Sequence, residues 1–287
     1  MLVDLINLTT SDDIKLDGVV FAPKSGVDKK GPIDAVLVMH GSQGNFYDAS
    51  NTIMADRLSQ QGYACLSLNV VSHDNVWSRD GKLYGNAYDI LDRCRIDIRA
   101  GVDYLWELGY RGIAILGFSM GAVRVAYYAA TENDERVATT IPISPVRLSY
   151  SYYMESPDAA EFKGIIDWAD QMEAEDKAME LLSVDFPISQ LFSAASYLDK
   201  HGPAERYNLV TLAPKIQIPM LVIGGSLETH TRLLNMAGDL AFAAVNSPRS
   251  ECVIVEGGNH SISNKRSEAS AAVLTWLASL ATQRVGV

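Results

Sequence analysis

One pentapeptide constrains the fold of this chain more than any other segment. Residues 117–121 read Gly-Phe-Ser-Met-Gly, with a glycine two positions before and two positions after Ser119. A continuous apolar run at 113–116 precedes the pentapeptide, and the helix-compatible run 122–130 follows it. Glycine at these flanking positions lets a strand and a helix approach each other closely. The pattern therefore predicts a sharp strand-to-helix turn that presents Ser119 at the edge of a sheet.

Apolar strand patterns alternate with helical patterns along almost the whole chain. This alternation favours an α/β fold, with a mostly parallel sheet covered by helices on both faces. The expected opening is a hairpin formed by 2–7 and 15–22. The strands expected after it are 35–39, 64–70, 112–116, 137–143, 220–223 and 253–255, and the expected helices are 47–61, 87–108 and 265–282.

A long segment interrupts this alternation. More than seventy residues without a clear strand follow the strand expected at 137–143. A helix is expected from Ser156-Pro157 onward, because serine caps helices and proline suits their first position, and a second helix is expected at 188–199. We interpret the segment as a helical cap over the catalytic edge of the sheet; the alternative is a packing excursion away from the site. The expected division is core residues 1–145, cap residues 146–215 and core residues 216–287.

Composition and charge narrow the classes of function. The chain has 287 residues and a formal net charge of -11, which argues against nucleic acid as a partner. It contains no apolar stretch long enough to cross a bilayer, and its start lacks the pattern of a signal peptide. Cys65, Cys94 and Cys252 lie in apolar segments, which predicts reduced, buried thiols and a cytoplasmic location. We expect a small-molecule substrate, no membrane contact, no metal, no cofactor and a possible homodimer.

A serine nucleophile needs a base, and the base needs an orienting acid. His260 is the best candidate base, because it follows the strand expected at 253–255 and would reach the same sheet edge as Ser119. Glu228 follows the strand before that one and is the preferred acid, with Glu256 as the second candidate. The pattern predicts a catalytic group made of Ser119, Glu228 and His260.

The negative charge that develops during acyl transfer needs backbone N–H donors. The residue after the nucleophile, Met120, supplies one donor. The second is expected from the segment His-Gly-Ser-Gln-Gly at 40–44, with the amide of Ser42 favoured and that of Gln43 second. A plain turn at the end of a strand is the alternative for this segment.

In these motifs and their order, the chain resembles the α/β-hydrolase superfamily across essentially its whole length. The likeness is carried by His40-Gly41, 117–121, 225–228 and 258–260. The resemblance implies an eight-stranded, mostly parallel sheet with a catalytic triad at its carboxyl edge, and we expect the helical cap after the sixth strand. Two features depart from the commonest pattern: the acid is Glu instead of Asp, and the segment at 40–44 lacks the His-Gly-Gly-Gly form of one esterase branch.

Five side chains are candidate substrate contacts. His40 ends a strand, and Trp77 and Arg79 lie in a long polar loop after a central strand, where substrate contacts are common. Tyr153 and Trp168 belong to an aromatic group in the expected cap, which favours a substrate with a hydrophobic part. Ordinary loop charges and a cap core of its own are the alternatives.

These observations predict a serine hydrolase that cleaves a carboxylic ester or thioester of a small, partly hydrophobic substrate through an acyl-enzyme. The same three residues would also serve amide hydrolysis, C–C bond hydrolysis or acyl transfer to an alcohol. A different class of function is a non-catalytic receptor that uses the pocket for binding only.

Overall fold

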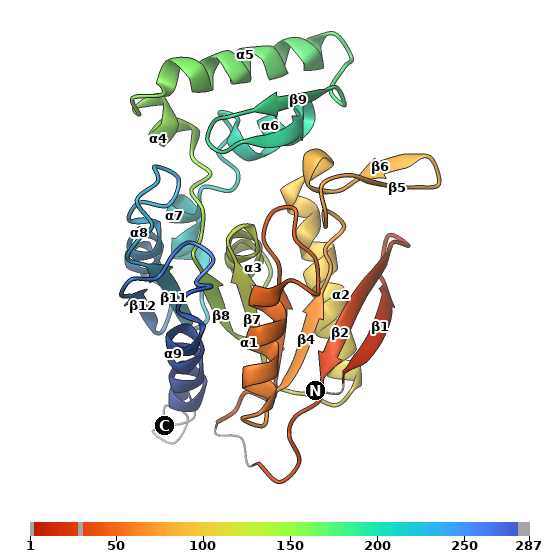
Figure 1. Ribbon diagram of the computed structural model, residues 1–287, viewed down its shortest axis with the longest axis vertical. Helices are drawn as coiled ribbons and strands as arrows, with labels where there is room; N and C mark the ends of the chain where they lie inside the picture. The colour runs from red at the N-terminus through yellow and green to blue at the C-terminus, as the bar shows by residue number, and fades with distance from the viewer. Residues whose placement is uncertain (1–2, 28–30, 281–287) are drawn as a thin grey trace.

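An eight-stranded sheet forms the centre of the protein in a computed structural model that describes residues 3–27 and 31–280 (Figure 1). The strand order is β1-β2-β4-β3-β7-β8-β11-β12, and the pairings from β4 through β12 are parallel, whereas β1–β2 and β2–β4 are antiparallel. The predicted α/β architecture with a mostly parallel sheet of eight strands is confirmed. The strands are β1 (Asp4–Thr9), β2 (Lys15–Phe21), β3 (Ala35–Met39), β4 (Ala64–Leu68), β7 (Ile113–Phe118), β8 (Val137–Ile143), β11 (Met220–Gly225) and β12 (Ser250–Val255).

Helices cover both faces of this sheet. Because strand side chains alternate between faces, Leu37 and Met39 of β3 join one apolar cluster and Val36 and Val38 join the other. The first cluster includes α2, α3 and α8, and the second includes α1 and α9, which lie in front of the sheet in Figure 1. These helices are α1 (Ala49–Ser59), α2 (Cys94–Glu107), α3 (Met120–Thr131), α8 (Met236–Ala243) and α9 (Arg266–Ser279).

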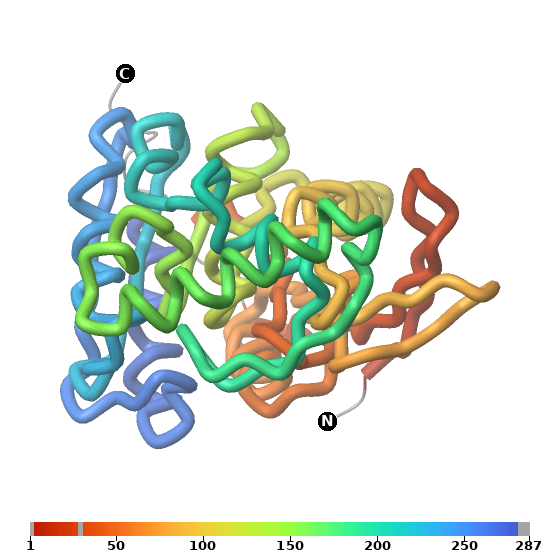
Figure 2. The backbone as a smooth tube through the Cα atoms, turned by 90° about the horizontal axis from the view of Figure 1, so that it is seen from above, coloured from red at the N-terminus to blue at the C-terminus, as the bar shows by residue number. Residues whose placement is uncertain are grey.

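Residues 144–219, between β8 and β11, form what we call the insertion. Its first part, α4 through α6, lies beyond the carboxyl edge of the sheet and crosses over the middle of the fold when seen from above (Figures 1 and 2). That part has its own apolar cluster, whereas α7 and η3 return to the sheet and pack on α3. Its elements are α4 (Tyr150–Met154), α5 (Ala159–Ala174), β9 (Leu181–Val184), β10 (Gln190–Ser193), α6 (Ala194–His201), α7 (Leu209–Leu212) and the 3-10 turn η3 (Ala213–Lys215).

The expectation that the insertion contains no strand is wrong. Residues 190–193 pair with 181–184 as an antiparallel hairpin, so the helix predicted at 188–199 begins only at Ala194. Ser193 explains the boundary, because its side chain accepts a hydrogen bond from the amide of Ser196 and so caps the helix.

Other helix boundaries also differ from the prediction. α5 begins at Ala159, after the Ser156-Pro157 pair instead of within it. α2 begins at Cys94, because the chain before it forms two separate 3-10 turns, η1 (Asn86–Tyr88) and η2 (Leu91–Arg93). α9 ends at Ser279, and the last two residues predicted for it, 281 and 282, lie outside the described residues.

A short hairpin and an exposed cysteine lie at the periphery of the fold. The long loop after β4 contains a short hairpin, β5 (Trp77–Arg79) and β6 (Lys82–Tyr84), which projects away from the body of the fold (Figure 1). Cys65 and Cys94 are buried, but Cys252 is exposed because β12 is an edge strand, so the prediction of three buried thiols is wrong for that residue. Across 3–27 and 31–280, every helix is too short or too polar to span a bilayer.

Candidate active site

Ser119 lies at a strained turn between a strand and a helix. β7 ends at Phe118 and α3 begins at Met120, so Ser119 alone makes the connection, with a φ of 55°. A positive φ is uncommon for a residue with a side chain and is retained where the surroundings enforce it. Gly121 is part of that enforcement, because a Cβ there would lie 2.4 Å from the carbonyl oxygen of Met39. The turn therefore needs glycine and directs the serine hydroxyl to the carboxyl edge of the sheet.

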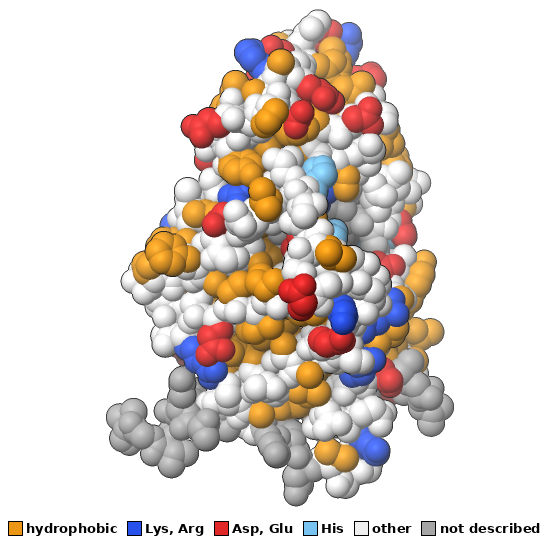
Figure 3. Space-filling view, turned by 60° about the vertical axis from the view of Figure 1, so that its left-hand side comes forward, with side chains coloured by type: hydrophobic (Ala, Val, Ile, Leu, Met, Phe, Trp, Pro, Cys, Tyr) orange, Lys and Arg blue, Asp and Glu red, His pale blue; other side chains and the backbone are white. Residues whose placement is uncertain are grey.

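The imidazole of His260 lies next to this hydroxyl. Ser119 Oγ and His260 Nε2 are 2.9 Å apart, although 141 residues separate them in the chain. His260 belongs to what we call the histidine loop, residues 256–265, which follows β12. Asn259 braces this loop by accepting a hydrogen bond from the amide of Ser263 at 3.0 Å. The His260 side chain is 34% exposed, and Figure 3 shows histidine side chains, in pale blue, at the surface below the insertion.

The carboxylate of Glu228 faces the other nitrogen of this imidazole. His260 Nδ1 and Glu228 Oε1 are 3.5 Å apart, and both atoms are buried without a hydrogen-bond partner among the described residues. The two atoms thus face each other, and such contacts often shorten when substrate binds. Glu256, the alternative acid, is exposed at the surface.

Contact between the loops that carry Glu228 and His260 holds these two side chains in position relative to each other. We call residues 226–235, which follow β11, the acid loop. The amide of Leu227 donates a hydrogen bond to the carbonyl oxygen of Gly258 at 3.0 Å. A Cβ on Gly225 would lie 2.3 Å from that same oxygen, so the two loops can approach this closely only because residue 225 is glycine.

Ser42 and Met120 meet at a small cavity of about 10 Å³ beside the turn. The Met120 amide has no partner within its helix, because Met120 is the first helical residue. The Ser42 amide finds no acceptor within the described parts of the chain. Gln43, the second candidate, is exposed, has a φ of 57° and does not line this cavity. Ser42 and Met120 thus remain the predicted pair of N–H donors.

The side chain of His40 holds the backbone of residues 40–44 in place from inside the protein. It is fully buried, its Nδ1 donates to the carbonyl oxygen of Gly41 at 2.8 Å, and its Nε2 accepts from the amide of Val70 at 3.2 Å. Burial, together with the nearby Arg124 charge, lowers the pKa of His40 to about 3, so the ring is neutral at pH 7. The prediction that His40 contacts substrate is therefore wrong, because both ring nitrogens already bind backbone.

A buried ion cluster joins the core to the insertion. Arg124 on α3 donates to Asp89 at 3.0 Å and to the carbonyl oxygen of His40 at 3.2 Å. Lys200 on α6 lies 3.1 Å from the same Asp89 carboxylate, and the three side chains are at most 3% exposed. Opposite charges thus fix α6 of the insertion against the helix that begins at the serine turn.

The other four predicted substrate contacts do not line the cavity beside Ser42. Tyr153 is fully buried and donates to the carbonyl oxygen of Arg147, so the prediction that it contacts substrate is wrong. Trp168 is half-buried on α5 and packs on the apolar cluster of the insertion. Trp77 and Arg79 belong to the projecting β5–β6 hairpin, where Trp77 stacks between two rings of that loop.

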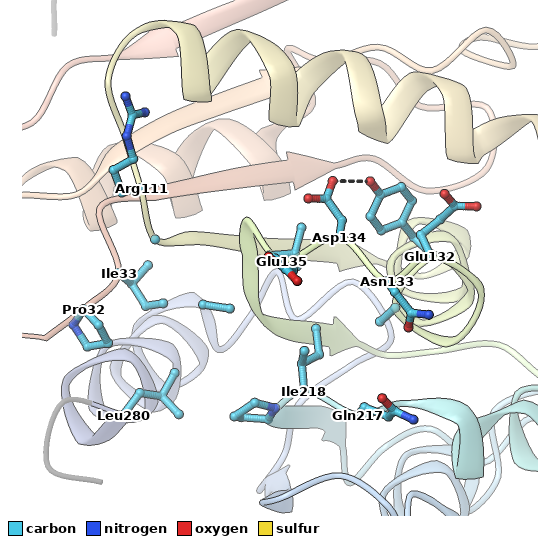
Figure 4. A pocket seen from close by; sticks show the side chains of 16 residues that line it. Pro32, Ile33, Arg111, Glu132, Asn133, Asp134, Glu135, Gln217, Ile218 and Leu280 are labelled. Carbon is cyan, nitrogen blue, oxygen red and sulfur yellow. Dashed lines mark hydrogen bonds between the residues drawn. The ribbon is translucent and has the colours of Figure 1, made fainter. Parts of the chain in front are cut away.

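A cavity of about 710 Å³ lies at the opposite edge of the sheet (Figure 4). Its lining includes Pro32, Gly112, Val137 and Pro219, which precede or begin β3, β7, β8 and β11. These positions mark the amino ends of the strands. This cavity is therefore far from the serine turn and contains none of the three predicted catalytic residues.

The small cavity beside Ser42 brings in residues that sequence reasoning missed. Arg147 and His201 from the insertion line it, together with Arg232 from the acid loop. Arg232 lies four residues after Glu228, and this spacing was the one available sequence signal. Arg147 and His201 carried no signal, because their approach depends on how the insertion folds back over the sheet.

Comparison with solved structures agrees with this architecture. GrgF, an alpha/beta hydrolase from Penicillium sp. sh18, aligns with a TM-score of 0.71 at 16% identity, covering 98% of this chain and 100% of that chain. The chain has the α/β-hydrolase fold.

Two further α/β-hydrolase-like structures carry names that refer to esters. The Pyrococcus furiosus esterase Pf2001 aligns at 18% identity with a TM-score of 0.61, covering 96% of this chain and 91% of that chain. A soluble variant of monoglyceride lipase from Saccharomyces cerevisiae aligns at 12% identity with a TM-score of 0.70, covering 98% of this chain and 96% of that chain. No family model and no curated protein sequence matches the chain.

Proposed function

We propose that this protein is a serine hydrolase that cleaves a carboxylic ester, or a thioester, of a small and partly hydrophobic substrate. The observation that carries the proposal is the 2.9 Å contact between Ser119 Oγ and His260 Nε2 at a strained strand-to-helix turn. Such a turn costs free energy that an idle serine would not require. Solved structures of the same fold that are named esterase and lipase support an ester as the substrate.

The reaction begins with attack by Ser119 Oγ on the carbonyl carbon of the ester. His260 Nε2 accepts the hydroxyl proton as the new C–O bond forms, and the imidazolium then donates that proton to the departing alcohol oxygen. Glu228 holds the His260 tautomer that carries its proton on Nδ1 and stabilises the imidazolium. Water, deprotonated by His260, then attacks the acyl-enzyme and releases the acid and free Ser119.

The amides of Ser42 and Met120 stabilise the oxyanion of each tetrahedral intermediate. Removing one such donor typically costs about 2.7–4 kcal/mol of transition-state stabilisation. His40 and Arg124 hold the backbone next to Ser42 in place. One ring nitrogen of His40 binds the carbonyl of Gly41, and Arg124 binds the carbonyl of His40. A fixed donor needs no reorganisation during the reaction.

A panel of p-nitrophenyl esters with graded acyl length tests the proposal. We expect wild-type protein to release p-nitrophenol and Ser119→Ala to lose this activity. Ser183→Ala, which removes an exposed serine from β9, serves as the matched control and keeps wild-type activity. Activity that survives in Ser119→Ala would assign the chemistry to another residue.

A fluorophosphonate probe separates the enzyme from a receptor that only shares the fold. The probe reacts with a serine that a neighbouring base activates. We expect it to label wild-type protein and Ser183→Ala, and not Ser119→Ala. A folded wild-type protein that stays unlabelled would refute the hydrolase and favour the receptor.

A further inference from the structure

Arg232 is a buried cation that has no counter-ion in the part of the chain that the structure describes. The residue is 6% exposed, and no carboxylate or carbonyl group of the described residues forms an ion pair or hydrogen bond with its guanidinium. Buried charges in proteins are normally paired, because removing a charge from water is costly. Burial accordingly lowers the pKa of Arg232. An arginine nevertheless keeps its charge, so the acid loop holds an uncompensated positive charge.

The other buried arginines near the site show the contrast. Arg124 pairs with Asp89 at 3.0 Å, and Arg147 pairs with Asp239 at 2.5 Å. Arg147 also stacks on Tyr152, with its guanidinium carbon 4.2 Å from the ring centroid. Both therefore have structural partners that account for their burial. The guanidinium of Arg232 has none among residues 3–27 and 31–280.

The surroundings of Arg232 indicate what its missing partner would be. Arg232 lines the same cavity as Ser42 and Met120, whose amides are the proposed oxyanion donors. Ser42 Oγ and His201 Nδ1 are also buried there without hydrogen-bond partners within the described chain. The cavity is about 10 Å³, room for about one water molecule, so a larger group enters only when the insertion side chains that line it, such as Phe192, move aside. A single site thus combines unpaired polar groups, a fixed positive charge and the position next to the reacting carbonyl.

We propose that Arg232 binds a carboxylate of the substrate, so that the ester carries a negative charge close to its scissile carbonyl. The inference rests on the proposed hydrolase function and narrows its substrate to anionic esters, such as half-esters of dicarboxylic acids. A guanidinium is planar and presents paired N–H donors that match the two oxygens of a carboxylate. The carboxylate supplies the counter-ion that the described part of the chain does not provide.

Matched pairs of substrates test the charge directly. p-Nitrophenyl adipate, with a free carboxylate at the end of its acyl chain, is compared with its neutral isostere p-nitrophenyl adipamate. A second pair, 4-carboxyphenyl butyrate and 4-carbamoylphenyl butyrate, places the charge on the leaving group. Hydrogen bonds to charged groups correspond to about 10- to 100-fold in kcat/KM, so we expect a preference of that size for the anionic member of one pair.

Variants assign the preference to Arg232. Arg232→Gln is expected to remove the preference, so that kcat/KM for the anionic ester falls to that for its neutral partner, and Arg232→Lys is expected to keep part of it. Arg99→Gln, which removes an exposed arginine from α2, controls for net charge and keeps the full preference. Because the native charge is buried without a partner, Arg232→Gln should also unfold at a temperature no lower than wild type.

A binding measurement separates this inference from the proposed hydrolase function. Adipate binding to the Ser119→Ala variant is measured by calorimetry, with and without Arg232→Gln. Binding that Arg232→Gln abolishes supports the carboxylate site, even if no ester is cleaved and the hydrolase proposal fails. Equal rates on both members of each pair, or adipate binding that is absent or unchanged by Arg232→Gln, would overturn the inference while Ser119-dependent hydrolysis still stood.

Discussion

Replacing Asp89 by asparagine should destabilise the protein strongly. Asp89 accepts from Arg124 at 3.0 Å and lies 3.1 Å from Lys200, and all three side chains are at most 3% exposed. Burial alone would raise the pKa of Asp89, but the two cations hold it below its ordinary value. Asparagine keeps the shape and removes the charge, leaving two buried cations beside each other. Breaking a buried pair in this way costs about 3–5 kcal/mol of the free energy of unfolding.

Urea denaturation followed by circular dichroism measures this effect. Asp103→Asn is the matched control, because Asp103 is 49% exposed and pairs with Arg136 at the surface. That variant should lose no more than about 1 kcal/mol. Combining Asp89→Asn with Lys200→Met removes one of the stranded cations and should recover part of the loss.

Two results would contradict the proposed coupling of Asp89 with Arg124 and Lys200. A loss for Asp89→Asn no larger than that for Asp103→Asn would mean that the buried charges are not coupled as their distances indicate. Failure of Lys200→Met to recover any stability would mean that the cost arises from lost hydrogen bonds instead of stranded charge.

Three further changes test other parts of the structure. Gly225→Ala should lower kcat about 100-fold, because its Cβ would push the acid loop and the histidine loop apart. Gly164→Ala is the control, because residue 164 has open space around it, and should keep the wild-type kcat. Equal kcat values for the two variants would contradict this prediction. Glu228→Gln should lower kcat by about 10⁴-fold without loss of stability, and Glu256→Gln should have no effect; the reverse order would exchange their roles. Burial lowers the pKa of His201 to about 3. Between about pH 3 and pH 6.5 the unfolded chain therefore binds more protons than the folded protein, and the free energy of unfolding rises with pH across this window. His201→Phe should reduce that slope by about 1.4 kcal/mol per pH unit in urea titrations between about pH 4 and pH 6, and an unchanged slope would refute the assignment.

The strands of the core were predictable because local patterns define them. β3 and β7 are buried along their whole length, and their continuous apolar runs show this directly in the sequence. Gly-Phe-Ser-Met-Gly marks a turn whose geometry depends on its own glycines. Ser119, Glu228 and His260 follow such strands, so the order of the strands in the sheet brings them to one edge.

Features that depend on tertiary packing were not predictable. β10 has no clear pattern of its own and exists because it pairs with β9. The substrate-contact predictions for His40 and Tyr153 assumed that residues near the site face it, whereas both are buried and bind backbone groups. The exposure of Arg232 to the cavity depends on the insertion folding back over the acid loop, which no local pattern records.

Trapping of the acyl-enzyme tests the central claim most directly. Wild-type protein is mixed with p-nitrophenyl butyrate, quenched in acid within milliseconds and digested with trypsin. The peptide 112–124 contains Ser119 as its sole serine, so a butyryl mass on it identifies the nucleophile. We predict that this mass appears in wild type and is absent from Ser119→Ala. A butyryl group on a different peptide, with 112–124 unmodified, would contradict the account.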